Sequence, residues 1–189
     1  MARKSKPRPV LKKRRAARMA AVQALYQIEQ SNQLAGHVVT EFKQHRLQSL
    51  LQPFMPEAPA IDVDIPWFEL LVPGAWSQRA VLDEKIGRCL QPGWTLERCG
   101  YLLRACLRAG AFELASRNDV PTEVIIAEYV EVAKLFLGGD EPRFIHAVLD
   151  RLVSVLRTRP PATDGSDDGS GDGDSGQDGA GENGVGSGP

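Results

Sequence analysis

The chain has 189 residues, with 23 Lys and Arg against 24 Asp and Glu, and this length is enough for one globular domain with a sizeable core. Its net charge of −1 conceals two opposite ends: residues 1–18 carry nine bases and no acid, whereas residues 160–189 carry seven acids and no base. The sequence has no run of eighteen apolar residues, and its three cysteines show no C-x-x-C spacing. These features argue against a membrane protein, a disulfide framework and a zinc site, and we expect a cytoplasmic protein without a bound metal.

The first predicted helix covers residues 14–31 and begins in the basic end of the chain. An apolar stripe recurs along it at helical spacing, and the other side crowds three arginines: Arg14, Arg15 and Arg18. Arginine-rich arms of this kind bind RNA phosphates and order as they bind. A solvated tail and a targeting arm are the alternatives. The continuous helix that follows, with Gln23 and Tyr26, favours a retained RNA-binding element.

The next part of the chain predicts two helices separated by a proline-rich loop. Residues 34–51 are amphipathic, and three prolines in residues 53–64 then withhold hydrogen-bond donors and end the helical pattern. Asp64 is a predicted N-cap for the following helix. The apolar stripe over residues 64–89 predicts one long helix, which we expect Pro73 to kink or loosen.

Three further helices are predicted toward the C-terminus. They cover residues 95–114, residues 121–136 and a last segment that Asp140 caps and that ends near residue 157. No stretch shows the period-two alternation of a strand. We therefore predict an all-α fold of about six to seven helices in two packed bundles.

The two ends are predicted to lie outside this helical domain. We expect a flexible basic arm at residues 1–13, the helical domain at residues 14–158 and a disordered Gly/Asp/Ser-rich acidic tail at residues 159–189. The tail serves either to keep the protein soluble or to compete for the basic arm within the molecule.

Motifs that carry catalysis are absent from the sequence. It contains no P-loop, no dinucleotide-binding glycine motif, no H-E-x-x-H and no G-x-S-x-G. Cys99 lies on a predicted apolar stripe, and the paired acids fall where solvated helix faces or caps would place them. We therefore expect a binding protein that is not an enzyme and uses no cofactor.

Four stretches resemble the bacterial family of the transcription antitermination protein NusB, in the same order along the chain. They are RRAARMAAVQALYQ at 14–27, LRAGAFEL at 107–114, DVPTEVIIAEYVEVAK at 119–134 and GGDEPRFIHAVLD at 138–150. The resemblance covers about residues 12–157 and is poor between residues 47 and 66. It implies a non-enzymatic, all-helical protein that binds the single-stranded boxA element of ribosomal RNA leaders. The implied partners are a small-subunit ribosomal protein acting as NusE, other Nus factors and RNA polymerase.

The resemblance also implies a set of site residues. Those that match RNA-contacting positions are Arg14, Arg15, Arg18, Gln23, Tyr26, Asp140, Arg143 and Phe144, with His146 beside them. Those that match positions approached by the ribosomal protein are Tyr26 and Leu103. On this reading the arginines neutralise phosphates, whereas Phe144 stacks on an unpaired base.

Four residues depart from the family pattern. Ala16 replaces a basic residue that some members have, His146-Ala147 replaces Asn-Gly, and Leu103 replaces an acid. Two other readings of the chain remain. One is a helical protein-interaction adaptor with non-specific RNA affinity. The other is a stand-alone relative of the NusB-like domain of ribosomal RNA methyltransferases, in which a Rossmann-like catalytic domain follows instead of an acidic tail.

Overall fold

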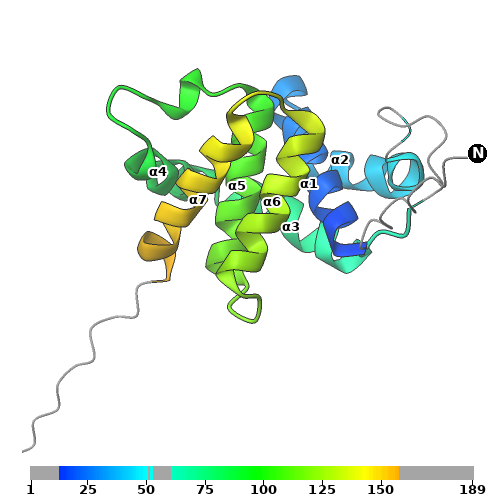
Figure 1. The fold of residues 1–189 in the computed structure, drawn as a ribbon. Helices are drawn as coiled ribbons and strands as arrows, with labels where there is room; N and C mark the ends of the chain where they lie inside the picture. Colours follow the sequence, from blue (N-terminus) through cyan, green and yellow to red (C-terminus); the bar gives the residue numbers. More distant parts are fainter. Residues whose placement is uncertain (1–12, 51, 53–60, 158–189) are drawn as a thin grey trace, which may run out of the picture. The chain divides into compact units, whose positions relative to one another are not determined.

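The computed structural model describes residues 13–50, 52 and 61–157. This part of the chain forms seven α-helices, whose arrangement Figure 1 shows. Their bounds are α1 Lys13–Ser31, α2 Ala35–Glu41, α3 Ile65–Ser77, α4 Arg79–Cys89, α5 Tyr101–Ser116, α6 Thr122–Phe136 and α7 Glu141–Leu156. A π-helical turn at Phe42–Arg46 and 3-10 turns at Leu47–Ser49 and Leu96–Arg98 complete the regular structure. The described residues form no strand, so the all-α prediction is confirmed. The acidic tail and all of the basic arm except Lys13 lie outside them.

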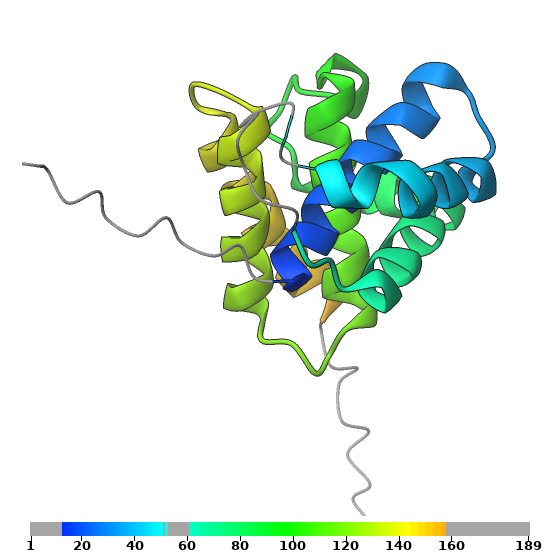
Figure 2. The same cartoon turned by 90° about the vertical axis from the view of Figure 1, so that its right-hand side faces the viewer.

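The helices α1 and α5 form the centre of the domain and run in opposite directions. Glu29 near the end of α1 pairs with Arg108 of α5, and Arg18 near the start of α1 pairs with Glu113 farther along α5. The helices α2 and α3 pack on one side of this pair, and α4, α6 and α7 pack around α5 on the other (Figures 1 and 2). The predicted two packed bundles are therefore confirmed, with the α1–α5 contact joining them.

The helix α1 is buried around most of its circumference and not along a single stripe. Every residue from 16 to 22 is buried, and four of these seven are alanines. Small side chains let neighbouring helices approach closely, so α3, α5 and α6 all contact α1. The sequence pattern predicted one buried stripe because alanine does not distinguish an interior face from an exposed one.

The start of α3 follows the sequence prediction, but its end does not. The Asp64 carboxylate accepts a hydrogen bond from the Trp67 backbone N–H at 3.1 Å, which confirms the predicted N-cap. The prediction of a single long helix over residues 64–89 is wrong. Gln78 has a non-helical backbone conformation (φ −96°, ψ 7°), which divides this segment into the two helices α3 and α4. Pro73 lies inside α3, and the break comes about one helical turn after it.

Candidate nucleic-acid interface

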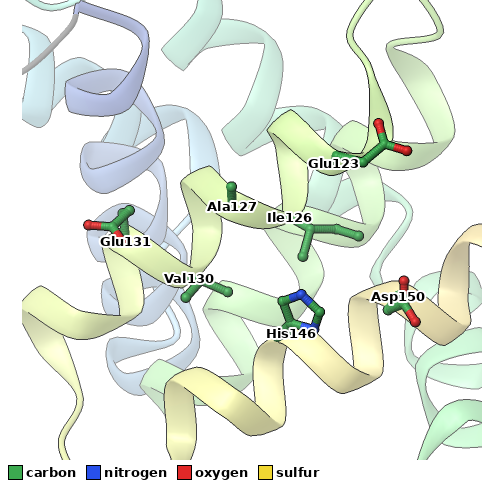
Figure 3. Close-up of a pocket in the computed structure, with 7 residues that line it drawn as sticks. All are labelled: Glu123, Ile126, Ala127, Val130, Glu131, His146 and Asp150. Carbon is green, nitrogen blue, oxygen red and sulfur yellow. The ribbon is translucent and has the colours of Figure 1, made fainter.

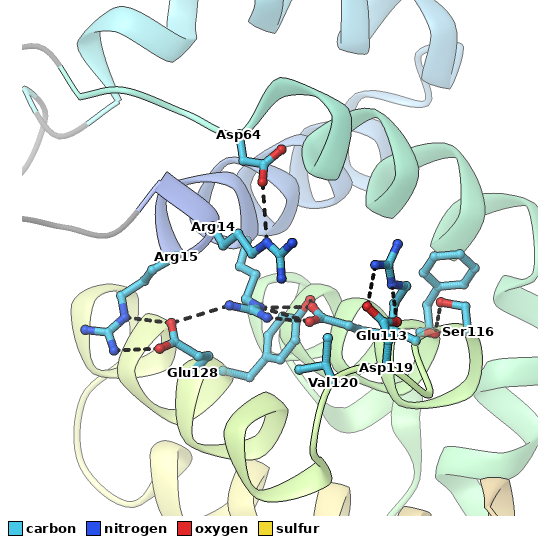
Figure 4. A network of polar contacts seen from close by, with 12 residues as sticks. Arg14, Arg15, Asp64, Glu113, Ser116, Asp119, Val120 and Glu128 are labelled. Carbon is cyan, nitrogen blue, oxygen red and sulfur yellow. Dashed lines mark hydrogen bonds and ion pairs between the residues drawn. The ribbon is translucent and has the colours of Figure 1, made fainter.

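The first turn of α1 presents cationic side chains at the surface. The Arg14 side chain is 53 % exposed, and its guanidinium lies 4.3 Å from the centroid of the Trp67 ring and 3.5 Å from the Asp64 carboxylate. Arg15, which is 28 % exposed, donates two hydrogen bonds of 2.7 and 2.8 Å to Glu128 of α6. Figure 4 shows Arg14 turned toward Asp64 and Arg15 turned toward Glu128. Both arginines therefore lie where an anion can reach them.

Arg18 is buried, so the expectation that it shares the exposed side of α1 with Arg14 and Arg15 is wrong. Its Nε donates to both carboxylate oxygens of Glu113, at 3.2 and 3.0 Å, and the Tyr129 hydroxyl donates to the same carboxylate at 3.0 Å. Burial opposes the charge of Arg18, but the hydrogen bonds that it donates to Glu113, together with the negative charges of Glu113 and Glu128, outweigh burial and raise the pKa of the guanidinium. Burial also raises the pKa of Tyr129 well above its usual value. Arg18 thus joins α1 to α5 in the interior.

Farther along α1, Gln23 and Tyr26 line an open groove of about 630 Å³. Leu102 at the start of α5, Phe136 at the end of α6 and Arg46 also line it. Three more glutamines belong to the lining, which therefore combines amide donors and acceptors with apolar side chains: Gln27, Gln30 and Gln33. Such a lining offers partners to the polar edge of a base or to a peptide backbone.

Leu103, the second residue matched to a protein-partner position, does not face this groove. It is only 8 % exposed and belongs to the hydrophobic core. An apolar side chain at this turn of α5 is more stable in the interior, while its neighbour Leu102 lines the groove. The role of Leu103 in partner contact stays a prediction.

The first turn of α7 carries the second group of predicted site residues. Asp140 and Arg143 are exposed and lie 3.5 Å apart. The Asp140 carboxylate makes no capping hydrogen bond, so the predicted side-chain cap is wrong; its backbone is already helical (φ −96°, ψ −2°), whereas an N-cap uses an extended conformation. Phe144 is half-buried and its ring lies 5.6 Å from that of Trp94, tilted by 41°. An aromatic pair therefore adjoins an exposed arginine here.

His146 lines a different hollow, of about 280 Å³, between α6 and α7. Figure 3 shows its ring turned toward α6, where Val130 and Ile126 lie. The remaining charged groups of this hollow are acidic: Glu123, Glu131 and Asp150. This acidic lining makes the hollow unfavourable for phosphate.

Two parts of the predicted site lie beside α6. Arg15 lies beside Glu128 in the middle of this helix, and the groove of Gln23 and Tyr26 reaches Phe136 at its end. Eight residues separate Glu128 from Phe136, which corresponds to about 12 Å of helix, and α7 begins five residues later. We call the set formed by Arg14, Arg15, Gln23, Tyr26, Arg143 and Phe144 the candidate surface. The sequence reading missed Trp94 beside it, although a tryptophan after Pro-Gly in a predicted turn was the available signal.

The described part of the chain has neither a membrane-spanning helix nor a cluster of metal ligands. None of its helices is long and apolar enough to cross a membrane. Residues 13–50, 52 and 61–157 also contain no group of three His, Cys, Asp or Glu side chains that could hold a metal ion. The three cysteines are buried and unpaired, and burial raises the pKa of the Cys106 thiol to about 12.

The fold and the candidate surface together define an all-helical protein that carries exposed cationic, amide and aromatic side chains. The model of the NusB family matches residues 15–154, and the chain belongs to this family. The transcription antitermination protein NusB of Sinorhizobium fredii is 44% identical over 144 residues, which cover 76% of this chain and 88% of that protein. The protein of the same name from Brucella suis is 44% identical over 145 residues, covering 77% and 82%.

Solved structures show the same fold. NusB from T. maritima superposes with a TM-score of 0.59 at 25% identity, covering 74% of this chain and 89% of that one. A crystal structure of the antitermination factors NusB and NusE in complex with dsRNA matches with a TM-score of 0.56 at 21% identity, covering 75% and 96%. NusB from Aquifex aeolicus, solved in solution, matches with a TM-score of 0.59 at 20% identity, covering 79% and 94%. These three proteins share the domain architecture described above.

Proposed function

We propose that this protein is an RNA-binding transcription antitermination factor that recognises boxA-type single-stranded RNA in ribosomal RNA leaders. One combination of observations supports the proposal most strongly. Exposed arginines at the start of α1, an amide-lined groove beside α1 and α6, and an aromatic residue in the first turn of α7 occur together on a fold whose curated relatives are named transcription antitermination proteins. Phosphate, base-edge and base-stacking contacts are the three kinds that single-stranded RNA requires.

Each part of the candidate surface has its own task in this proposal. Arg14 and Arg15 neutralise phosphates, which gives affinity that depends strongly on salt and weakly on sequence. Gln23 offers donors and acceptors to base edges, and Phe144 stacks on an unpaired base. Asp140 and Arg143, an exposed ion pair at the start of α7, contact the RNA next to the stacked base. Arg18 acts on RNA only by holding α1 in place, and His146 makes no RNA contact.

A protein partner completes the assembly that we propose. The solved complex of NusB and NusE with dsRNA shows that proteins of this fold assemble with a protein and an RNA together. The groove of Tyr26, Leu102 and Phe136 suits such a partner because it combines apolar side chains with amides. We infer that a small-subunit ribosomal protein acting as NusE binds there. Other Nus factors and RNA polymerase join in the cytoplasm, and the protein contributes binding without catalysis or cofactor.

Salt dependence of RNA binding tests this division of labour. The double variant Arg14→Ala/Arg15→Ala is expected to bind a boxA-like RNA more weakly, with the slope of log K against log salt reduced by about 1.4, since each lost phosphate contact removes about 0.7. Phe144→Ala is expected to weaken binding about 5-fold or more with little change of slope. Fluorescence anisotropy at several salt concentrations measures both. Equal slopes for the two variants would contradict the assignment.

A further inference from the structure

Trp94 is an exposed aromatic residue that neither the fold nor the candidate surface uses. Its side chain is 50 % exposed, in a connection between α4 and α5 that otherwise buries Leu96 and Cys99. A half-exposed tryptophan lacks much of the stabilising free energy that full burial would supply. A ligand that covered the exposed half of the ring would supply it.

The local backbone fixes where Trp94 lies. The Trp94 N–H donates to the Gln91 carbonyl at 3.0 Å, Pro92 follows Gln91, and Gly93 has φ +84°. Proline at the second position and glycine with positive φ at the third are the features of a type II β-turn. Arg98 also donates to the Gly93 carbonyl at 3.1 Å. The turn thus fixes the backbone position from which the Trp94 side chain projects.

The surroundings of Trp94 are aromatic and cationic. Its ring lies 5.6 Å from that of Phe144, and the Arg98 guanidinium lies 6.0 Å from its centroid. Arg143, next to Phe144 in the first turn of α7, has an 89 % exposed side chain. Aromatic faces flanked by guanidinium groups are the stacking platforms that bind unpaired nucleic-acid bases.

We propose that Trp94 is a second base-stacking residue, which extends the candidate surface from Phe144 onto the α4–α5 connection and binds one further unpaired nucleotide of single-stranded RNA. Continuity with Phe144 and Arg143 favours RNA over a protein ligand, and Arg98 supplies a cation for the adjoining phosphate. The inference rests on the proposed function, since it assigns a contact within the same RNA complex. Nothing in the sequence resemblance pointed to this residue.

The test compares Trp94→Ala with Trp94→Phe in the full-length chain, using a single-stranded boxA-like RNA and anisotropy. Trp94→Ala is expected to lower affinity about 5-fold or more without changing the salt slope, because one stacked base is lost and no phosphate contact is. Trp94→Phe keeps a flat aromatic face and is expected to retain most of the affinity. RNA is also expected to quench tryptophan fluorescence in the unmodified protein and to quench it far less in Trp94→Phe.

Trp76→Ala is the matched control. Trp76 also has an arginine over its ring, with Arg79 at 4.6 Å, but it lies on α3 outside the candidate surface, so its replacement is expected to leave RNA affinity unchanged. Circular dichroism melts confirm that each variant folds.

RNA affinity of Trp94→Ala equal to that of the unmodified protein overturns this inference alone. The inference is also overturned if Trp94→Ala retains its RNA affinity and loses only its affinity for the ribosomal protein. Absence of RNA binding by the unmodified protein overturns the proposed function as well.

Discussion

Arg15 of α1 and Glu128 of α6 face each other through two nearly equal hydrogen bonds, of 2.7 and 2.8 Å. These bonds raise the pKa of the Arg15 guanidinium, and the nearby Glu131 adds to the effect. Because the pair is partly exposed, a phosphate that approaches Arg15 also meets the carboxylate. The structure therefore places a repulsive charge within the surface that we assign to RNA.

Neutralising that carboxylate is expected to strengthen RNA binding. Removing one unit charge a few ångströms from a bound phosphate relieves about 1 kcal/mol of repulsion in water, so Glu128→Gln is expected to raise affinity about 5-fold at low salt and less at high salt. Anisotropy titrations measure this change. Glu84→Gln is the control, because Glu84 pairs with Arg88 on α4 in an exposed ion pair away from α1. Lower or unchanged affinity for Glu128→Gln, in a protein that melts normally, would show that phosphate does not approach Arg15.

The buried pair of Arg18 and Glu113 is expected to control stability. Arg18→Met leaves the Glu113 carboxylate without its cation in the interior, which costs about 3–5 kcal/mol in the free energy of unfolding. The double variant Arg18→Met/Glu113→Leu removes both charges and is expected to be much more stable than the single one. Urea unfolding compares them, with Arg88→Met at the exposed surface as the control. A loss in Arg18→Met as small as in Arg88→Met would remove the structural role given to Arg18.

Alkaline pH is expected to weaken the fold through Cys106. Burial raises the pKa of this thiol from 9.0 to about 12, so the folded state keeps the proton that the unfolded state releases. Stability is then complete below pH 9 and falls as the pH rises toward 12, by about 2 kcal/mol at pH 10.5. Urea unfolding at pH 7, 9 and 10.5 measures the loss. Cys106→Ala is expected to reduce the slope without abolishing it, because burial also raises the pKa of Tyr129. An unchanged slope in this variant would contradict the assignment.

Replacing two helical glycines by alanine is expected to change the stability of the protein in opposite directions. A Cβ at Gly74 of α3 would lie 2.1 Å from Cζ of the buried Phe112, so Gly74→Ala is expected to cost about 1–3 kcal/mol as the ring is displaced. Gly87 of α4 has no atom within 4 Å of the same point, and Gly87→Ala is expected to stabilise the protein by about 0.5–1 kcal/mol. Thermal melts of both variants test the α3–α5 contact. A Gly74→Ala variant as stable as the unmodified protein would show that α3 and α5 are not in close contact there.

Much of the fold was predictable because its strongest signals are local. The Asp64 cap and the helix at residues 121–136 depend on residues next to them in the sequence, and the structure has both, with α6 at Thr122–Phe136. The break at Gln78 was not predictable from the apolar stripe, which runs through both α3 and α4. The sequence prediction placed the irregularity at Pro73, because proline is the usual cause of a kink. In the structure Pro73 lies inside α3, and the helix ends four residues later, at Ser77.

The sequence predicted which residue types form the candidate site, but it did not predict which way each side chain points. The side chain of Arg18 points inward because Glu113, 95 residues away, provides a buried partner that no helical pattern reveals. Leu103 and His146 were assigned by matching positions, which identifies a place along a helix but not the groups packed around it. Trp94 was missed because its contact with Phe144 joins a turn and a helix that are 50 residues apart.

Binding of RNA with and without its protein partner tests the central claim most directly. Anisotropy with a boxA-like RNA and a scrambled control, at two salt concentrations and with or without the cognate ribosomal protein, separates sequence recognition from charge attraction. The account predicts a preference for the boxA-like RNA that increases when the ribosomal protein is present. Equal binding of both RNAs, lost at higher salt and unaffected by the ribosomal protein, would contradict it.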